Sequence, residues 1–521
     1  MFDVLPRELI GVIVNKLNEF DAISFGKTNK RFKETLSRTD YGYVVSKPIM
    51  VYTMIHPQNR KRRINLIGGQ FTSFIIKNRS DISLLPNVTK RIILHDEFTG
   101  TIDNNDLIHF KSLTHLRMRN GMKQPIISNM NLPISLTHLE IGSCIDFIVK
   151  YIKLPCSITH LKFGDRFNQS IDYIVLPDFL SHLEFGNYFN HPVDHLILPR
   201  FITHLKFGEN FNQSMDNIIL PNSLSHLEFG HNFDQNLDKI QLPCSISHLK
   251  FGHNFNQPIH KDKLSSLSEL KNLEFGPWFD QNMDDVELPG SLIHLKWTGD
   301  LHYLSFSECH DRVHLFHLSR LLTNSTLTSH SKFENLTHLT LGHEFDQPIS
   351  NIKLPNSITH LIFGRSFNQR LDQFHAPKCL THLEFGSSFN QPVCKLKVSH
   401  CLSLTLVRFG DKFNHPIDDL VLPASVQHLS FGYSFNQCVD NFHVPNLLST
   451  LIFGNWFNKC VDNIQLPLSG SFTHLIFGYA FNRPLDKLRI PKSLQYIQIG
   501  SKFKQPIHNL KLPTLCQLVR V

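Results

Sequence analysis

The sequence lacks several features that define large classes of proteins. No apolar run approaches the ~18 residues of a membrane-spanning helix, so we expect no membrane insertion. Residues 1–4 show neither the basic start nor the apolar run of a signal peptide. The ten cysteines include no Cys-x-x-Cys pair, which argues against zinc and a disulfide framework. We therefore expect a reducing location, cytoplasmic or alternatively nuclear, with Cys438 and Cys460 as free thiols.

Signatures of catalysis and of nucleotide binding are also missing. The chain has no glycine-rich phosphate loop, no plausible Ser/His/Asp setting and no candidate active cysteine. We therefore expect no enzyme: no catalytic residue, no cofactor and no metal site.

A unit of 22 residues repeats almost without a break from about Leu85 onward. Residues 158–172, Ile-Thr-His-Leu-Lys-Phe-Gly-Asp-Arg-Phe-Asn-Gln-Ser-Ile-Asp, form one copy, and the glycine marks the phase of the others. A fixed period of about 20 to 29 residues predicts a solenoid, a stack of similar turns with one long surface. We count about 19 turns, one of them a degenerate turn at 299–330.

Each unit contains the pattern of a short β-strand. In residues 160–163, His-Leu-Lys-Phe, apolar and polar side chains alternate, so leucine and phenylalanine face the core and the other two face outward. The spacing Ile158-x-x-Leu161-x-Phe163 is that of leucine-rich repeats. The sequence therefore predicts a leucine-rich-repeat-like, β-rich repeat solenoid with one parallel strand per turn.

Several positions recur so regularly that stacking would turn them into columns. The positions of Phe163 and Phe167 hold most of the 43 phenylalanines and predict two aromatic columns in the core. Asn168 and its equivalents could bond the corner backbone of their own turn and of the next. Asp172 and its equivalents fit Asx-turns, a stacked metal site or a catalytic pair, and Asx-turns are favoured. His160 and its equivalents predict an exposed imidazole ladder rather than a metal site.

The outward position after His-Leu separates two parts of the array. From Lys162 to Lys296 it alternates strictly between lysine and glutamate, so neighbouring turns neutralise each other. Later turns instead carry Ile452 and Ile476 there, and the loop beyond the glycine adds aromatic residues. Exposed aliphatic and aromatic side chains together are typical of interface centres. The predicted partner patch consists of Ile452, Ile476, Tyr433, Trp456 and Tyr479; the alternative is that the rings cover the edge of the array itself.

Positive charge is concentrated at the start of the chain. Residues 1–91 hold 16 Lys and Arg against 7 Asp and Glu, which leaves 36 against 37 for the rest. A nucleic-acid-binding groove would carry its positive charge along the array, so we expect no nucleic acid there. The basic run at 60–63 fits a solvated loop, or alternatively a nuclear-localisation or phosphate-binding patch.

Residues 2–40 have a helical pattern and carry a family resemblance. Leu5-Pro6-Arg7-Glu8-Leu9-Ile10, followed by Ile13, Leu17 and the stretch 29–32, Asn-Lys-Arg-Phe, resembles an F-box. Gly26 and Thr28 depart from its later part. The repeats resemble the FNIP family, most plainly in Phe-Asn-Gln-Pro-Ile at 255–259. Proteins with this pairing are known from slime moulds and from large DNA viruses of amoebae.

These resemblances imply a domain plan and a function. The plan is an F-box at 1–48, a linker or N-terminal cap at 49–84 and the FNIP solenoid at 85–521. F-box proteins join target proteins to a cullin ubiquitin ligase through a Skp-type adaptor, and Leu5, Pro6, Leu9 and Ile13 would contact that adaptor. The chain would act as a monomer within that complex, in the host cytoplasm if it is viral, with an unknown target. The alternative is a protein-binding scaffold without ubiquitin-ligase coupling.

Overall fold

Each turn contributes one short strand, and strands of successive turns pair in parallel. A computed structural model of the chain shows a parallel β-solenoid of about 17 turns, with almost no helix in the described residues. It describes residues 49–51, 72–99, 102, 105–118, 131–142, 153–172, 174–260, 262–279, 281, 286–297, 335–342, 345–346, 348–349, 354–468, 470–507 and 510–521. The predicted fold class is therefore confirmed for the solenoid.

The chain divides into two units. Unit 1 comprises Met1–Gln235 and Lys239–Pro243, and unit 2 comprises Asn236–Asp238 and Cys244–Val521. The described elements of unit 1 are β1 (Ile49–Val51), β2 (Ser73–Asn78), the 3-10 helix η2 (Arg79–Leu84), β3 (Arg91–Thr99), β4 (His115–Met118), β5 (His138–Ile141), β6 (His160–Phe163), β7 (His182–Glu184), β8 (His204–Lys206) and β9 (His226–Glu228). Those of unit 2 are β10 (His248–Lys250), α5 (Asp262–Ser265), β11 (Asn272–Phe275), β12 (His294–Trp297), β13 (His338–Thr340), β14 (His360–Ile362), β15 (His382–Glu384), β16 (Leu406–Arg408), β17 (His428–Ser430), β18 (Thr450–Ile452), β19 (His474–Ile476), β20 (Tyr496–Ile499) and β21 (Gln517–Arg520).

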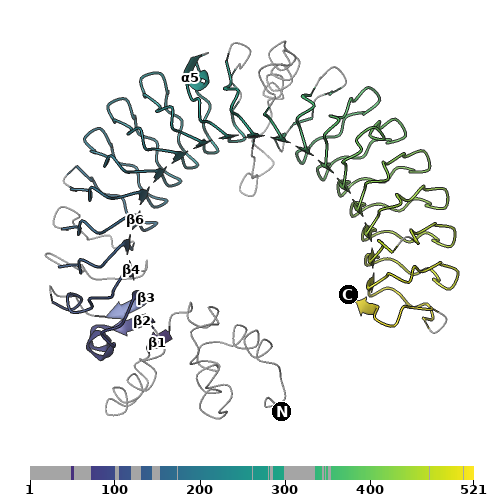
Figure 1. Ribbon diagram of the computed structural model, residues 1–521, viewed down its shortest axis with the longest axis horizontal. Coiled ribbons are helices and arrows are strands. Elements are labelled where there is room, and N and C mark those ends of the chain that lie inside the picture. Colours follow the sequence, from purple (N-terminus) through teal and green to yellow (C-terminus); the bar gives the residue numbers. More distant parts are fainter. Residues whose placement is uncertain are drawn as a thin grey trace, which may run out of the picture. The chain divides into compact units, whose positions relative to one another are not determined.

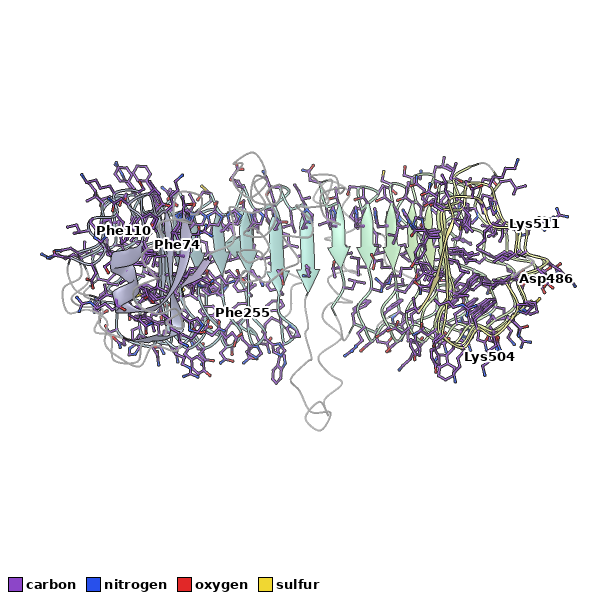
Figure 2. The ribbon with its side chains drawn as sticks, turned by 90° about the horizontal axis from the view of Figure 1, so that it is seen from below. Phe74, Phe110, Phe255, Asp486, Lys504 and Lys511 are labelled. Atoms are coloured by element: carbon purple, nitrogen blue, oxygen red, sulfur yellow. The ribbon has the colours of Figure 1, made fainter. Side chains whose placement is uncertain are left out.

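The strand register places equivalent motif positions side by side. In β6 and β7, for example, His160 lies opposite His182 and Lys162 lies opposite Glu184. Within each unit the strand arrows point the same way (Figure 2). Within each unit the strands also follow the inner edge of the coil, while the connecting loops spread on its outer side (Figure 1). Every repeated side chain therefore becomes part of a column that runs from turn to turn.

Two phenylalanine columns fill the core, as predicted. Phe163 and Phe167 of one turn stack with centroids 4.4 Å apart, and Phe163 stacks on Phe185 of the next turn at 5.4 Å. These rings are almost fully buried. A buried Phe stabilises the fold by ~1.5–3 kcal/mol through removal of apolar surface from water. The offset stacking adds to this with every turn.

A glycine column lets successive turns approach closely at the corner after each strand. A Cβ atom built on Gly208 would lie 2.0 Å from the carbonyl oxygen of Gly186, and the same conflict recurs between Gly186 and Gly164. No side chain fits in that space. The glycine that marks the repeat phase in the sequence is therefore required by the distance between turns.

A ladder of asparagine side chains accepts the backbone amides at the corner that follows the second phenylalanine of each turn. Asn168 Oδ1 accepts the backbone N–H of Asn190 at 2.9 Å, and Asn190 Oδ1 accepts that of Asn212 at 2.9 Å. The glutamine after the asparagine adds a second donor: Gln213 Nε2 lies 3.0 Å from Asn190 Oδ1. Because a corner amide has no ladder partner, this bond to the following turn explains the Phe-Asn-Gln motif. The predicted role of the asparagines is confirmed for the bond to the next turn.

Two details differ from the sequence-based expectation. The sheet begins before residue 85, because β1 pairs with β2 and β2 pairs with β3. β2 lacks the Phe-Asn motif, which is why the repeat pattern did not reveal it.

The second difference concerns the degenerate turn expected at 299–330. β12 pairs directly with β13, so the sheet has no strand between them. Residues 299–330 themselves lie outside the described residues. Thr298 and Gly342, which occupy the glycine position of their units, lie 44 residues apart in the sequence. This distance equals two repeat units, but an insertion between two adjacent turns produces the same spacing. The described array therefore has about 17 turns rather than the expected 19.

The glycine column gives a direct test of turn packing. Gly208→Ala should lower the free energy of unfolding by ~1–3 kcal/mol, because the new methyl group forces neighbouring backbone apart. Chemical denaturation of the full chain measures this. The control is Glu209→Ala, at the exposed adjacent position, which should change stability little. Equal stability of both variants would contradict the packing argument.

Candidate protein-binding surface

The outward side of the strands forms a surface of two parallel columns, here called the strand face. One column contains the histidine that starts most strands, and the other contains the residue two positions later. In unit 1 the first column runs from His115 through His138, His160, His182 and His204. Neighbouring imidazoles stack with centroids 4.0–4.1 Å apart and planes 12–14° from parallel. The predicted imidazole ladder is therefore present and half-buried.

Hydroxyl groups beside this ladder hold the imidazole rings in place through Nδ1. Thr137 Oγ1 lies 3.1 Å from the carbonyl oxygen of Thr114 and 2.9 Å from Nδ1 of His138. The Thr137 hydroxyl thus links the imidazole of His138 to the backbone of the preceding turn.

The same arrangement recurs on later turns. The hydroxyls of Thr159, Ser181 and Thr203 each contact a carbonyl of the previous turn and Nδ1 of the following histidine. Where Asn272 replaces histidine, its side-chain amide lies 2.6 Å from Nε2 of His248. The strand face thus presents a row of imidazole rings that are held through the same ring nitrogen, Nδ1.

The ladder resists protonation. Burial, followed by the positive charge that neighbouring histidines would carry, lowers the pKa of His138 and of His182 to about 4. In unit 2 the same causes lower the pKa of His338 to about 4. Stacked imidazolium rings 4 Å apart would repel each other, so the neutral form predominates at pH 7.

The second column of the strand face consists of alternating charges in unit 1. Arg117 Nε lies 2.9 Å from Glu140, Lys162 Nζ lies 2.7 Å from Glu184, and Lys206 Nζ lies 3.2 Å from Glu228. The predicted neighbour-to-neighbour neutralisation is observed. These pairs are partly exposed, so each contributes at most ~1 kcal/mol. This part of the strand face carries almost no net charge.

In unit 2 the second column changes character. Ile452 of β18 lies directly opposite Ile476 of β19, with Ser430 and Gln498 on their outer sides. Both isoleucines are partly exposed. The two strands thus place an uncharged aliphatic pair where unit 1 has an ion pair.

The aromatic members of the predicted patch lie in the loops after the glycine. Tyr433, Trp456 and Tyr479 are 49%, 58% and 51% exposed. Tyr433 and Trp456 make an edge-to-face contact with centroids 6.4 Å apart, while Lys502 Nζ lies 5.5 Å from the Tyr479 ring centre. The structure therefore brings together two pairs, the isoleucines and the Tyr433–Trp456 rings. Each of the three aromatic residues keeps about half of its surface exposed to solvent.

The aspartate column differs from the favoured Asx-turn interpretation. Its carboxylates accept side-chain donors from the following turn: Asn217 Nδ2 lies 3.2 Å from Asp194, and Lys239 Nζ lies 3.2 Å from Asp216. Among the described residues, none of these carboxylates accepts a backbone amide. At these two positions the carboxylate is thus bonded to the side chain of the following turn.

Two kinds of site are absent from the described residues. There, no group of three or more His, Cys, Asp or Glu residues is arranged to hold a metal ion. No helix in this part of the chain is long and apolar enough to cross a membrane. Cys438 and Cys460 are exposed free thiols. A polar hollow of about 660 Å³ lies in unit 1 beside Asp165, Tyr188 and Glu209.

The predicted adaptor-binding residues, Leu5, Pro6, Leu9 and Ile13, lie outside the described residues. The basic run at 60–63 lies outside them as well. Both predictions therefore stay predictions.

Sequence reasoning missed other exposed apolar side chains. Val175, Ile197 and Ile219, each just before a Leu-Pro pair, are 84–87% exposed. Trp278 occupies the same loop position as Trp456 and is 52% exposed. A comparison of every outward position between turns, rather than of the strand positions alone, would have found them.

The fold and its surface define a leucine-rich-repeat-like solenoid, a class that is typically a non-enzymatic binding scaffold. The FNIP Repeat family matches residues 150–188, 189–232, 233–267, 334–366, 413–456, 457–502 and 481–518. The chain thus contains FNIP repeats, as the sequence suggested. No curated protein matches the sequence.

Solved structures agree with this assignment. The giant-virus protein CroV588, described as a novel circular LRR protein, is 35% identical with a TM-score of 0.66. That match covers 91% of this chain and 64% of CroV588, so the chain spans less than two thirds of its length. TLR13 in complex with ssRNA13 is 15% identical with a TM-score of 0.50, covering 84% of this chain and 64% of that one, and shows the fold alone.

The histidine ladder predicts a pH-dependent stability. The folded-state pKa of about 4 for His138 and His182 lies below the usual 6.5, so the unfolded chain binds protons first as the pH falls. The melting temperature should therefore be constant above about pH 6.5 and fall between about pH 6.5 and 4. Thermal unfolding followed by circular dichroism measures this.

The matched control uses a residue that the array itself tolerates. His182→Asn copies Asn272, which occupies the same position on another turn. This variant should lose less stability than the parent chain over the same pH range. An identical pH profile for both would show that the ladder is not the titrating element.

Proposed function

We propose that the chain is a protein-binding scaffold that serves as the substrate-recognition subunit of a Skp/cullin/F-box-type ubiquitin ligase. In this proposal the solenoid holds a target protein, and the F-box-like segment at 1–48 binds the adaptor. The observation that carries the binding role is the partly exposed Ile452–Ile476 pair on the strand face of unit 2, together with the half-exposed Tyr433 and Trp456 in the loops after the glycine. Ubiquitin transfer itself would be done by the ligase's conjugating enzyme.

The target-binding surface consists of Ile452, Ile476, Tyr433, Trp456 and Tyr479. Half-exposed Tyr and Trp rings supply large contact area with few rotatable bonds, which is why they dominate the energy of protein interfaces. The aliphatic Ile452–Ile476 pair lacks the charge that would be costly to desolvate. These properties favour a protein target with an apolar centre to its interface.

A nucleic-acid ligand is less well supported. TLR13 was solved in complex with ssRNA13, but that protein shares only 15% identity with this chain. Phosphate binding depends on concentrated positive charge. On the strand face of unit 1, Arg117, Lys162 and Lys206 each form an ion pair with a glutamate. Their positive charge is therefore neutralised within the array.

The coupling to the ligase rests on the sequence resemblance of residues 5–13 to the first helix of an F-box. The alternative is a scaffold that binds proteins without recruiting the ligase.

Binding through the patch is tested by two substitutions. Trp456→Ala and Ile476→Glu should each weaken target capture by about tenfold, since such central interface residues contribute ~1.4 kcal/mol or more. Quantitative mass spectrometry of proteins co-purified with the full chain measures this. The control is Trp278→Ala, which removes an equally exposed Trp at the same loop position of another turn. If the capture profile is the same for all four proteins, the patch is elsewhere.

Ligase coupling is tested separately. The full chain should co-purify with a Skp-type adaptor, and the double variant Leu9→Ala/Ile13→Ala should lose this binding because both side chains lie on the predicted apolar stripe. The patch variants should retain it. Target capture without any adaptor binding would support the scaffold alternative.

A further inference from the structure

The loops of unit 1 carry an exposed apolar surface that the repeat does not require. Val175, Ile197 and Ile219 occupy the position before Leu-Pro on three consecutive turns and are 84–87% exposed. Phe179 and Phe201, four residues after the first two, are 60% and 41% exposed. We call these five residues the loop ridge. They lie in the segments that connect the strands from β6 to β9.

Other turns show that these positions need no apolar side chain. The equivalent of Val175 is exposed and polar on most described turns, where it is Lys153, Gln241, Glu287, His375, Lys397, His443, Gln465, Arg489 or Lys511. Val421 is an isolated exception. Because the same backbone position accepts charged residues, folding does not explain three aliphatic residues in succession. Their exposure also means that they stabilise the isolated chain little.

The two phenylalanines replace a structural serine. At the position of Phe179, Ser157 Oγ donates to the carbonyl of Leu136 at 2.7 Å, and Ser223 Oγ donates to that of Ile202 at 2.6 Å. Six further described turns repeat this bond. The turns that contain Phe179 and Phe201 lack this bond and expose an aromatic ring instead. The same two turns thus lack both the polar residue before Leu-Pro and the serine that bonds the previous turn.

The geometry of the ridge fits a helix lying along the array. Phe179 and Phe201 stack with centroids 5.6 Å apart and planes 10° from parallel. This spacing is close to the 5.4 Å pitch of an α-helix. One ridge residue per turn of the solenoid would meet one apolar residue per turn of a partner helix, at positions i, i+4 and i+7.

Charge identifies the flank of that helix. Asp172 and Asp194 precede Val175 and Ile197 by three residues, and neither pairs with a cation within the described residues. The Arg200 guanidinium lies 4.6 Å from the Phe201 ring centre. A partner helix with lysine or arginine along one side would therefore meet two carboxylates. We propose that the loop ridge binds a basic amphipathic helix of a partner protein, independently of the patch in unit 2.

The test selects ligands without assuming a partner. A display library of helical peptides is selected on the full chain and counter-selected against one variant: Val175→Lys, Ile197→Gln, Ile219→Gln, Phe179→Ser and Phe201→Ser. Each new residue already occupies the same position on another turn, so the variant should fold with an unchanged melting temperature. Enriched peptides should share an i, i+4, i+7 apolar stripe with flanking Lys or Arg. They should bind the variant at least about tenfold more weakly.

Two further measurements keep the result decisive. The single substitution Ile197→Gln, at a side chain 87% exposed, should weaken the same peptides without affecting the fold. Asp172→Asn with Asp194→Asn should weaken peptides rich in Lys more than neutral ones. The proposal is overturned if no enriched peptide depends on the ridge, or if ridge-dependent peptides are acidic or extended. It is also overturned if light scattering shows a dimer that the ridge variant abolishes, since the ridge would then join two copies of the chain.

Discussion

The structure depends on how closely one turn can approach the next. At the glycine column the backbone of Gly208 lies so near the carbonyl of Gly186 that no Cβ would fit. This close approach brings the aromatic rings, the imidazoles and the asparagines of successive turns within contact distance. Each stabilising interaction of a turn is therefore repeated along the array, and the total stability grows with the number of neighbours.

Regular stacking also determines where function can reside. When every outward position forms a column, most side chains interact with the equivalent side chain of the next turn, as in the Lys162–Glu184 ion pair and the stacked imidazoles. A partner needs side chains whose interactions are not already supplied by neighbouring turns. The two candidate surfaces are both places where a column changes chemistry: the Ile452–Ile476 pair in unit 2 and the loop ridge in unit 1. Departures from the repeat are thus more informative about binding than the repeat itself.

Much of the architecture could be predicted from the sequence because it is local and periodic. The alternation in residues 160–163 gave the strand, and the recurrence of Phe and Asn gave the aromatic core and the corner bonds. The pairing of β12 with β13 could not be predicted, since the number of residues between two motifs does not reveal whether they form a turn. The aspartates were misjudged for a related reason, as their partners lie 23 residues away. The exposure of the loop ridge depends on the path of the loops, for which the sequence has only a weak signal.

The asparagine ladder gives the array a direction. Each Asn Oδ1 accepts the amide of the turn that follows it, and no bond of this kind runs the other way in the described turns. Lys504 takes the asparagine position after Asn482, and its side chain has donors only, so the ladder stops there. Loss of one asparagine side chain therefore leaves the corner amide of the following turn without this acceptor, while the corner amide of its own turn keeps its bond to the preceding asparagine. The effect of such a substitution is thus one-sided along the array.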